Sequence, residues 1–239
     1  MRSMRVVELW RYPVKSLQGE PLESCEVGPD GLSGDRQWAL FDTRTGFGLT
    51  ARRVPGLLFA GGRLRADGGA EVVLPDGSVT DDDAVLSDWL ERPVVLRRAD
   101  QVADGRHYEN PADIDTEQRW DPFAGADGAF HDNAGARVTL LSTGSIGDWA
   151  PRRFRANVLL TGSGEDDLVG SRVRLGSTVL DVGMLVDRCV MTTRPQPGGI
   201  VRDTGVLKTI HRAYGGTLAV GAVPVAAGRI DLGDELATG

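Results

Sequence analysis

The sequence predicts a mainly β protein of the α+β class, in which short antiparallel strands build a barrel or sandwich and helices are few and short. Three observations support this prediction. Apolar runs are short, and glycine and proline separate them. The 239 residues include 32 glycines and 12 prolines, which favour many turns over long helices. Hydrophobic residues make up 41% of the chain, which is enough for one large core or two small ones.

Four short apolar runs near the start of the chain are predicted strands, because polar residues or turn residues bound each of them. A hairpin follows, in which Asp76 and Gly77 supply the positive φ angles that a tight turn requires. The predicted strands cover residues 4–14, 22–28, 36–42 and 46–52, and the hairpin covers 72–80.

One helix is predicted between residues 80 and 92. Thr80 can cap its first turn, which carries three aspartates in a favourable position against the helix dipole. Pro93 prevents the helix from continuing. The residues that share its apolar face at helical spacing are Val85, Leu86, Trp89 and Leu90.

Residues 99–136 are predicted to be an Asp/Gly-rich linker or loop, because they show little periodicity. Tyr108, Trp120 and Phe123 would be poor choices for a solvated tether, so we expect partial docking onto a neighbouring surface. The sequence thus predicts an N-terminal region over 1–98 and a C-terminal domain over 137–239.

The C-terminal part reads as further strands around one short helix, which Ser142 can cap and which extends through Trp149. A turn-rich loop is predicted at 196–205 from its proline and glycine content. The predicted strands cover residues 136–142, 153–162, 171–176, 177–183, 206–211 and 215–225.

The charge balance excludes some classes of function. The chain has 27 basic and 34 acidic residues, a net charge of −7 and a pI near 5.0, which argues against nucleic-acid and anionic-membrane partners. No apolar run is long enough to cross a bilayer, and the first residues lack the pattern of a secretory signal. We therefore expect a cytoplasmic protein.

The two cysteines, Cys25 and Cys189, are expected to be thiols. Arg188 precedes Cys189, and an adjacent cation lowers the pKa of a thiol, so Cys189 could be a nucleophile or a soft metal ligand. Spacing alone leaves a buried core thiol as the alternative, which fits Cys25 better. A structural zinc site is not expected, because the histidines are scattered at His107, His131 and His211.

Small basic motifs at predicted turns could hold a phosphate. Lys15 and Ser16 would project an ammonium and a hydroxyl from the end of a strand. Arg36 follows a glycine turn, and Arg155 and Asn157 share one side of a strand because they are two residues apart. An arginine guanidinium can form two parallel hydrogen bonds with a phosphate, and an asparagine amide can hydrogen-bond to the edge of a heterocycle. Each motif alone fits a surface turn or ion pair equally well.

Together, five ordered motifs resemble the MOSC family, the molybdenum-cofactor sulfurase C-terminal domain proteins. The resemblance covers nearly the whole chain, and it is closest in pattern to the amidoxime-reducing component and its bacterial counterparts. It implies a MOSC-type β-barrel domain preceded by a smaller β-barrel-like N-terminal region. The motifs are YPVKSLQGEPL, GDRQWALFD, LTARR, RFRANVLL and DRCVMTT.

The resemblance implies a binding site for the molybdenum cofactor, Mo-molybdopterin. Cys189 matches the cysteine that binds molybdenum in the family, and Arg188 precedes it as in the family. The family is also associated with pyridoxal phosphate binding. The other residues matched to cofactor contacts are Lys15, Ser16, Arg36, Arg155, Asn157 and Thr143.

The implied activity is that of a molybdenum-dependent oxidoreductase that reduces N-hydroxylated small molecules. The chain has no cysteine cluster for iron–sulfur binding and no glycine loop for a dinucleotide, so a separate reductase is the expected electron donor. Two alternatives stay open. Cys189 could carry a persulfide as a sulfurtransferase, or the chain could be a non-catalytic module that binds and stores the cofactor.

Overall fold

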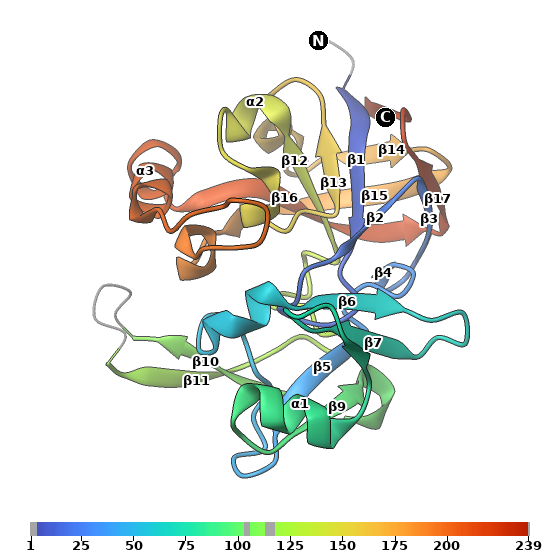
Figure 1. Cartoon of the computed structure of the whole chain (residues 1–239). Helices are drawn as coiled ribbons and strands as arrows, with labels where there is room; N and C mark the ends of the chain where they lie inside the picture. The colour runs from blue at the N-terminus through green and yellow to red at the C-terminus, as the bar shows by residue number, and fades with distance from the viewer. Residues whose placement is uncertain (1–3, 103–105, 113–117, 239) are drawn as a thin grey trace.

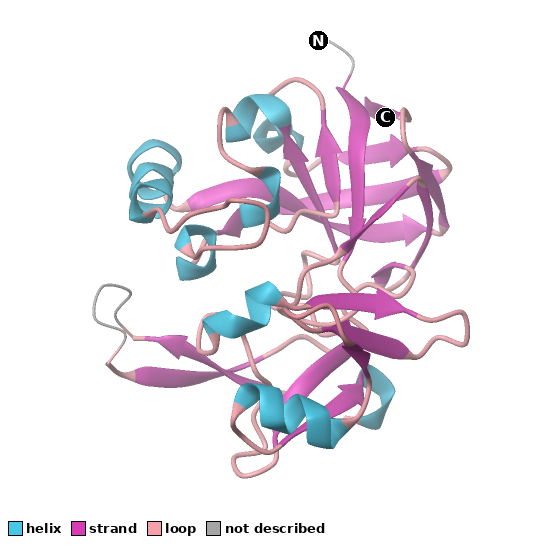
Figure 2. Ribbon diagram, in the orientation of Figure 1, coloured by secondary structure: helices cyan, strands magenta, loops and turns pink. Residues whose placement is uncertain are grey.

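The computed structural model describes residues 4–102, 106–112 and 118–238 (Figure 1). Strands form most of its regular structure, and the three α-helices in these residues are short, which confirms the mainly β prediction (Figure 2). Short 3-10 segments complete the secondary structure. They are η1 (Pro55–Phe59), η2 (Ala99–Gln101), η3 (Pro151–Arg153), η4 (Glu165–Leu168) and η5 (Val190–Thr193).

Seven strands close into a barrel, in the hydrogen-bonded order β13, β12, β16, β15, β14, β18, β1 and back to β13. All of these neighbours are antiparallel except β12 and β13. The barrel strands are β1 (Met4–Arg11), β12 (Val138–Ser142), β13 (Val158–Leu160), β14 (Arg172–Leu175), β15 (Thr178–Asp187), β16 (Thr217–Ala226) and β18 (Glu235–Thr238). In β14, Val173 and Leu175 are buried while Arg172 and Arg174 are exposed, the alternation expected of a strand with one solvated face.

The N-terminal strands pack with the C-terminal ones. β2 (Glu20–Leu22) pairs with β1, and β3 (Ser24–Gly28) pairs with both β4 (Gly31–Leu32) and β17 (Gly228–Asp231). Buried side chains of these first strands form one hydrophobic cluster with those of the barrel. The chain division at residues 98 and 136 stays a prediction.

A second, smaller unit follows β4 and lies below the barrel in the view of Figure 1. In it, β5 (Trp38–Asp42) pairs with β9 (Val94–Arg98), and β7 pairs with both β6 and β8. The other elements are β6 (Gly61–Leu64), β7 (Ala70–Val73), β8 (Val79–Thr80) and α1 (Asp83–Leu90). Its own core is built from buried side chains that include Leu40, Leu58, Val72, Leu86 and Leu96.

Helix α1 confirms the predicted helix, but the predicted cap was wrong. Asp82 is the N-cap, and its carboxylate accepts a hydrogen bond from the Ala84 amide at 2.7 Å. Thr80 ends β8 instead, and its hydroxyl accepts from the Asp82 amide. Leu86 is buried on the inner face as predicted, whereas Val85 is 41% exposed and lies off that face.

Residues 99–136, predicted as an Asp/Gly-rich linker or loop, contain a β-hairpin that was not predicted. β10 (His107–Pro111) pairs along its whole length with β11 (Trp120–Ala124). The aspartates and prolines of these strands have low β propensity, which hides the pattern in the sequence. The expected docking of aromatic residues is present, because Tyr108 is fully buried against Phe123 with ring centroids 5.4 Å apart.

Residues 206–211 belong to helix α3 (Thr204–Tyr214), and their prediction as a strand was wrong. Asp203 caps the helix by accepting from the Gly205 amide at 2.8 Å. The buried residues Val206, Leu207 and Ile210 are spaced as one helical face, which the short apolar run did not distinguish from a strand.

Helix α2 (Thr143–Ile146) begins at the predicted cap, where the Ser142 hydroxyl accepts from the Ser145 amide. It ends before Trp149, shorter than predicted, because the chain turns at Gly147 with φ +52°. Across 4–102, 106–112 and 118–238, no helix is both long enough and apolar enough to cross a membrane.

Candidate functional site

A cavity of about 530 Å³ is lined by residues from both units and from the segment that connects them. Six of the eight sequence-predicted site residues line it together. These are Lys15, Ser16, Arg36, Arg155, Arg188 and Cys189.

The cavity is cationic, in contrast to the whole chain. Its lining has six basic side chains and two acidic ones, Asp132 and Asp187. This concentration of positive charge favours an anionic ligand. The basic residues are Lys15, Arg36, Arg52, Arg153, Arg155 and Arg188.

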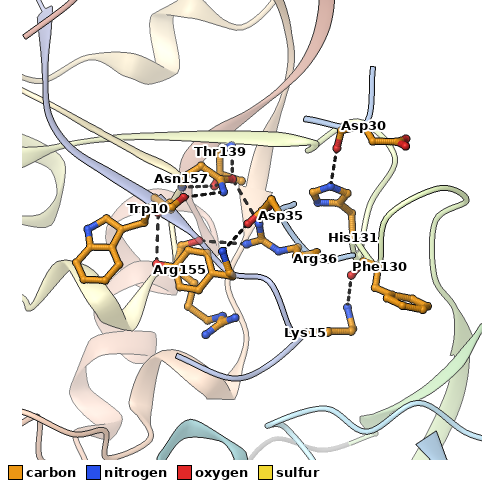
Figure 3. Close-up of polar contacts among 12 residues, drawn as sticks. Trp10, Lys15, Asp30, Asp35, Arg36, Phe130, His131, Thr139, Arg155 and Asn157 are labelled. Atoms are coloured by element: carbon orange, nitrogen blue, oxygen red, sulfur yellow. Dashed lines mark hydrogen bonds and ion pairs between the residues drawn. The ribbon is translucent and has the colours of Figure 1, made fainter. Parts of the chain in front are cut away.

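Arg36 is fixed in the wall by a buried network (Figure 3). Its Nη1 pairs with the fully buried Asp35 and lies 3.4 Å from Asn157 Oδ1, and its Nη2 donates to the Arg155 carbonyl at 3.2 Å. Asn157 is itself fully buried, and its Oδ1 also accepts from the Thr139 amide and hydroxyl at 3.1 and 3.0 Å. Asn157 does not line the cavity, and it supports the position of Arg36 from behind the cavity wall.

Arg155 lies beside Arg36 over the ring of Tyr12. The guanidinium carbons of Arg155 and Arg36 are 4.3 and 5.2 Å from the ring centroid, and Arg155 Nη1 donates to the Leu17 carbonyl at 2.5 Å. Burial lowers the pKa of Arg155 to about 10 and raises that of Tyr12 to about 12. At neutral pH this part of the wall therefore presents two cations, and the neutral phenol of Tyr12 lies behind them, outside the cavity lining.

Three predicted site residues have left-handed backbone conformations, with φ of +70° for Ser16, +51° for Arg36 and +52° for Arg155. Residues other than glycine rarely adopt this backbone region, because it is sterically strained. Residues with such strain are concentrated at functional sites. The fold therefore holds these three residues in conformations that local sequence preference disfavours.

Two further residues of the cavity, Arg52 and Asp132, were not predicted as site residues. Arg52 was identified only as part of the LTARR motif. Asp132 forms ion pairs with both Lys15 and Arg52, and Lys15 also donates to the Phe130 carbonyl at 2.9 Å. Burial lowers the pKa of Lys15, and the Asp132 carboxylate opposes this. Burial acts to raise the pKa of Asp132, but the charges of Lys15 and Arg52 outweigh it and hold that pKa far below 3.8.

Replacing Asp132 by asparagine is expected to lower the free energy of unfolding at pH 7 by about 1–2 kcal/mol, because it leaves Lys15 and Arg52 without their shared anion. The loss is limited because solvent reaches 46% of the Asp132 side chain and screens its charge. The depressed pKa means that the carboxylate stabilises the fold above its ordinary pKa and loses this effect as the pH falls. The difference in unfolding free energy between Asp132→Asn and the native protein, measured by urea unfolding, should become smaller below about pH 4.

Asp121→Asn is the matched control, since Asp121 pairs with Arg119 at the exposed end of the hairpin. It should leave the unfolding free energy nearly unchanged at every pH. An equal loss in both variants, or a loss that persists in acid, would contradict the assignment.

Cys189 is the N-cap of η5 and follows the end of β15 by two residues, and its thiol is free and half-buried. Burial acts to lower the pKa of Arg52, but the Asp132 carboxylate and Cys189 raise it, and Cys189 does so in part through a side-chain hydrogen bond, which places Arg52 beside the sulfur. Cys25 is also free, but it is buried in the barrel core and does not line the cavity.

Arg188 is anchored by backbone carbonyls, with Nε donating to Leu218 at 2.7 Å and Nη1 to Phe154 at 2.9 Å. Burial lowers its pKa to about 10. Its Nη2 is buried and has no hydrogen-bond partner among the residues that the structure describes. A buried donor of this kind favours an anionic acceptor in the cavity.

His131 also lines the cavity and is neutral at physiological pH, because burial and the charge of Arg36 lower its pKa to about 4. Its Nε2 is 3.0 Å from the Asp30 carbonyl, which can only accept, so Nε2 carries the proton and Nδ1 is an acceptor. His211 is exposed on α3 at the cavity, while His107 lies away from it.

The structure does not bring Thr143 to the cavity, because Thr143 is exposed at the first residue of α2. No group of three or more His, Cys, Asp or Glu side chains within the described ranges is arranged to hold a metal ion.

Two family models match the chain. The MOSC N-terminal beta barrel domain matches residues 3–91, and the MOSC domain matches residues 128–237. No curated protein matches it. Among solved structures, the YuaD protein from Bacillus subtilis aligns with a TM-score of 0.44 at 11% identity, over 98% of this chain and 94% of that one.

A second structure, YiiM from Geobacillus stearothermophilus, aligns with a TM-score of 0.35 at 16% identity, over 44% of this chain and 55% of that one. The two family matches together cover most of the sequence and occur in the order in which the N-terminal barrel and the MOSC domain were expected. The chain therefore belongs to the MOSC family, with a MOSC N-terminal β-barrel domain followed by a MOSC domain.

Proposed function

We propose that this protein is a molybdenum-cofactor-binding oxidoreductase that reduces N-hydroxylated small molecules with electrons from a separate reductase. MOSC domains are associated in general with the molybdenum cofactor. The observation that carries the proposal is a cationic cavity with a free thiol in its lining.

The residues present fit a ligand that carries both a phosphate and a soft metal. Arginine and lysine side chains suit the phosphate oxygens, and a thiolate suits molybdenum. The buried Nη2 of Arg188 supplies a donor that the described protein groups do not use. A cavity of about 530 Å³ is within the range of cofactor sites.

Each residue has a defined part in holding the cofactor. Lys15, Ser16, Arg36 and Arg155 would bind the phosphate, and Cys189 would bind the metal. Asn157 contributes indirectly by fixing Arg36. The left-handed conformations of Ser16, Arg36 and Arg155 hold their side chains in place before the ligand arrives, which lowers the cost of ordering on binding.

When bound, the molybdenum cofactor supplies two-electron oxygen-atom transfer. Reduction of an N-hydroxyl group consumes two electrons and two protons, breaks the N–O bond, and yields the N–H compound and water. We assign the electrons to a separate reductase, because the two cysteines of this sequence are too few to hold an iron–sulfur cluster. The Cys189 sulfur lies beside the guanidinium groups of Arg52 and Arg188 in the cavity lining.

The proposal is tested with protein from cells that make the molybdenum cofactor, using reduced benzyl viologen in place of the reductase and benzamidoxime as substrate. We expect oxidation of the dye together with formation of benzamidine. Protein from cells that cannot make the cofactor should show neither, and equal rates from both preparations would contradict the proposal.

A sulfur-carrier role is the second candidate, because the Cys189 thiol is free and reachable from the cavity. The molybdenum content of the active protein distinguishes this role from the reductase role. A carrier would take labelled sulfane sulfur from a donor persulfide, which leaves as the thiol, and would form a persulfide on Cys189. It would then pass this sulfur to an acceptor thiol and regenerate the Cys189 thiol, in protein that contains no molybdenum.

A further inference from the structure

The hairpin formed by β10 and β11 supplies one wall of the cavity. Asn110 and Pro111 from β10 and Phe123 from β11 line it. Tyr108 lies opposite Phe123 in the register, and Asn110 is two residues from Tyr108, so these three side chains share one face of the hairpin. The hairpin extends from the smaller unit on the same side of the molecule as α3 (Figure 1).

Tyr108 anchors this face. Its ring is fully buried, and the Lys15 ammonium lies 4.5 Å from the ring centroid. A Cβ on either Gly48 or Gly125 would collide with the ring, so the chain approaches Tyr108 closely on two sides. The wall is therefore a fixed part of the cavity, and Tyr108 sets the position of Phe123.

Phe123 lines the same cavity as the Cys189 thiol. The guanidinium carbon of Arg52 is 5.2 Å from the Phe123 ring centroid, and Arg52 also lines this cavity. Arg52 thus lies against the aromatic ring in the cavity that contains the sulfur. Arg36 and Arg155, which suit the phosphate, gather instead around Tyr12.

We propose that Phe123 and Asn110 form a substrate-selecting wall, and that the preferred substrates are N-hydroxylated compounds with a flat aromatic group. This inference rests on the proposed function and names its substrate class. Phe123 offers a half-buried ring against which an aromatic group can pack, and the Asn110 amide offers one donor and one acceptor for a polar N–O group.

The test compares Phe123→Ala with Phe47→Ala in protein loaded with molybdenum cofactor. Phe47 is the matched control, because its ring contacts the same hairpin at His107, with centroids 5.8 Å apart, but does not line the cavity. Binding of benzamidoxime and of acetamidoxime is measured by calorimetry without an electron donor, so that no turnover occurs. Turnover of both compounds with reduced benzyl viologen is measured in parallel.

Phe123→Ala is expected to weaken benzamidoxime binding, and to lower its kcat/KM relative to acetamidoxime, by about five- to tenfold. Molybdenum content should stay at the native value, Phe123→Tyr should restore the preference, and Phe47→Ala should keep it. An unchanged preference in Phe123→Ala, or equal losses for both compounds, would overturn the inference while leaving the proposed function in place.

Loss of molybdenum from Phe123→Ala would also overturn the inference, because it would assign the ring to the cofactor. If the loaded native protein neither binds nor reduces either compound, the proposed function itself fails, and the selecting wall fails with it.

Discussion

If Cys189 is the proposed metal ligand, Cys189→Ser is expected to abolish most molybdenum binding and to lower turnover of N-hydroxylated compounds at least about 100-fold, because the substitution removes the sulfur donor. A serine hydroxyl stays protonated at neutral pH and is a harder donor than a thiolate. The half-buried position of Cys189 at the start of η5 tolerates this small change, so the fold should survive. Elemental mass spectrometry of the purified proteins gives the molybdenum content per chain.

Cys25→Ser is the matched control, since it makes the same substitution at the other free cysteine. Cys25 lies in the barrel core, with its Sγ 3.3 Å from the Glu26 carbonyl, and does not line the cavity. It should keep the native molybdenum content even if it lowers stability. Full molybdenum content in Cys189→Ser, or the same loss in both variants, would contradict the assignment of Cys189 as the ligand.

Asp35→Asn is expected to lower the free energy of unfolding by about 3 kcal/mol, because it leaves the Arg36 guanidinium without its buried counter-ion. The Asp35 carboxylate is fully buried, pairs with Arg36 Nη1 and accepts from the Tyr12 amide at 2.7 Å. Urea unfolding followed by tryptophan fluorescence measures the change. The substitution should also weaken phosphate binding in the cavity, since Arg36 loses its orientation.

The control is Asp67→Asn, in which the same substitution breaks an exposed ion pair with Arg65 at 3.3 Å. Such pairs contribute little to stability, so the unfolding free energy should hardly change. If Asp35→Asn is as stable as Asp67→Asn, the network around Arg36 does not hold the site together.

Strands such as Arg172–Leu175 were predictable from the sequence because buried and exposed residues alternate along them. The pattern predicted a barrel or a sandwich, and the family resemblance favoured the barrel. Where the local pattern is ambiguous, the prediction fails. The apolar run at 206–211 fits a strand until Asp203 is recognised as a helix cap. Likewise, β10 and β11 carry aspartate and proline, and only their pairing makes them strands.

The packing of the N-terminal strands with the C-terminal ones could not be predicted from local patterns. β1 pairs with β13 and β18, and β3 pairs with β17, across most of the chain length. Such long-range pairing depends on the whole core, which a window of residues does not contain.

Some residues of the candidate site were also predictable from local sequence, and others were not. Motifs with adjacent polar residues, such as Lys15-Ser16 and Arg188-Cys189, were found in the sequence, and the structure brings them to one cavity. Asp132 was not found, because its partners Lys15 and Arg52 are 117 and 80 residues away and it is one of several aspartates in its segment. The aromatic residues within 99–136 predicted that this segment packs against a neighbouring surface. They did not predict that it forms a wall of the cavity.

The central claim is that Cys189 binds a molybdenum cofactor held in the cationic cavity. X-ray absorption at the molybdenum edge of the loaded native protein tests it most directly, because it counts the sulfur atoms bound to the metal. The account predicts one sulfur more than the two that the pterin dithiolene supplies. Molybdenum bound to the dithiolene sulfurs alone, or protein without molybdenum from cells with a confirmed supply of cofactor, would contradict it.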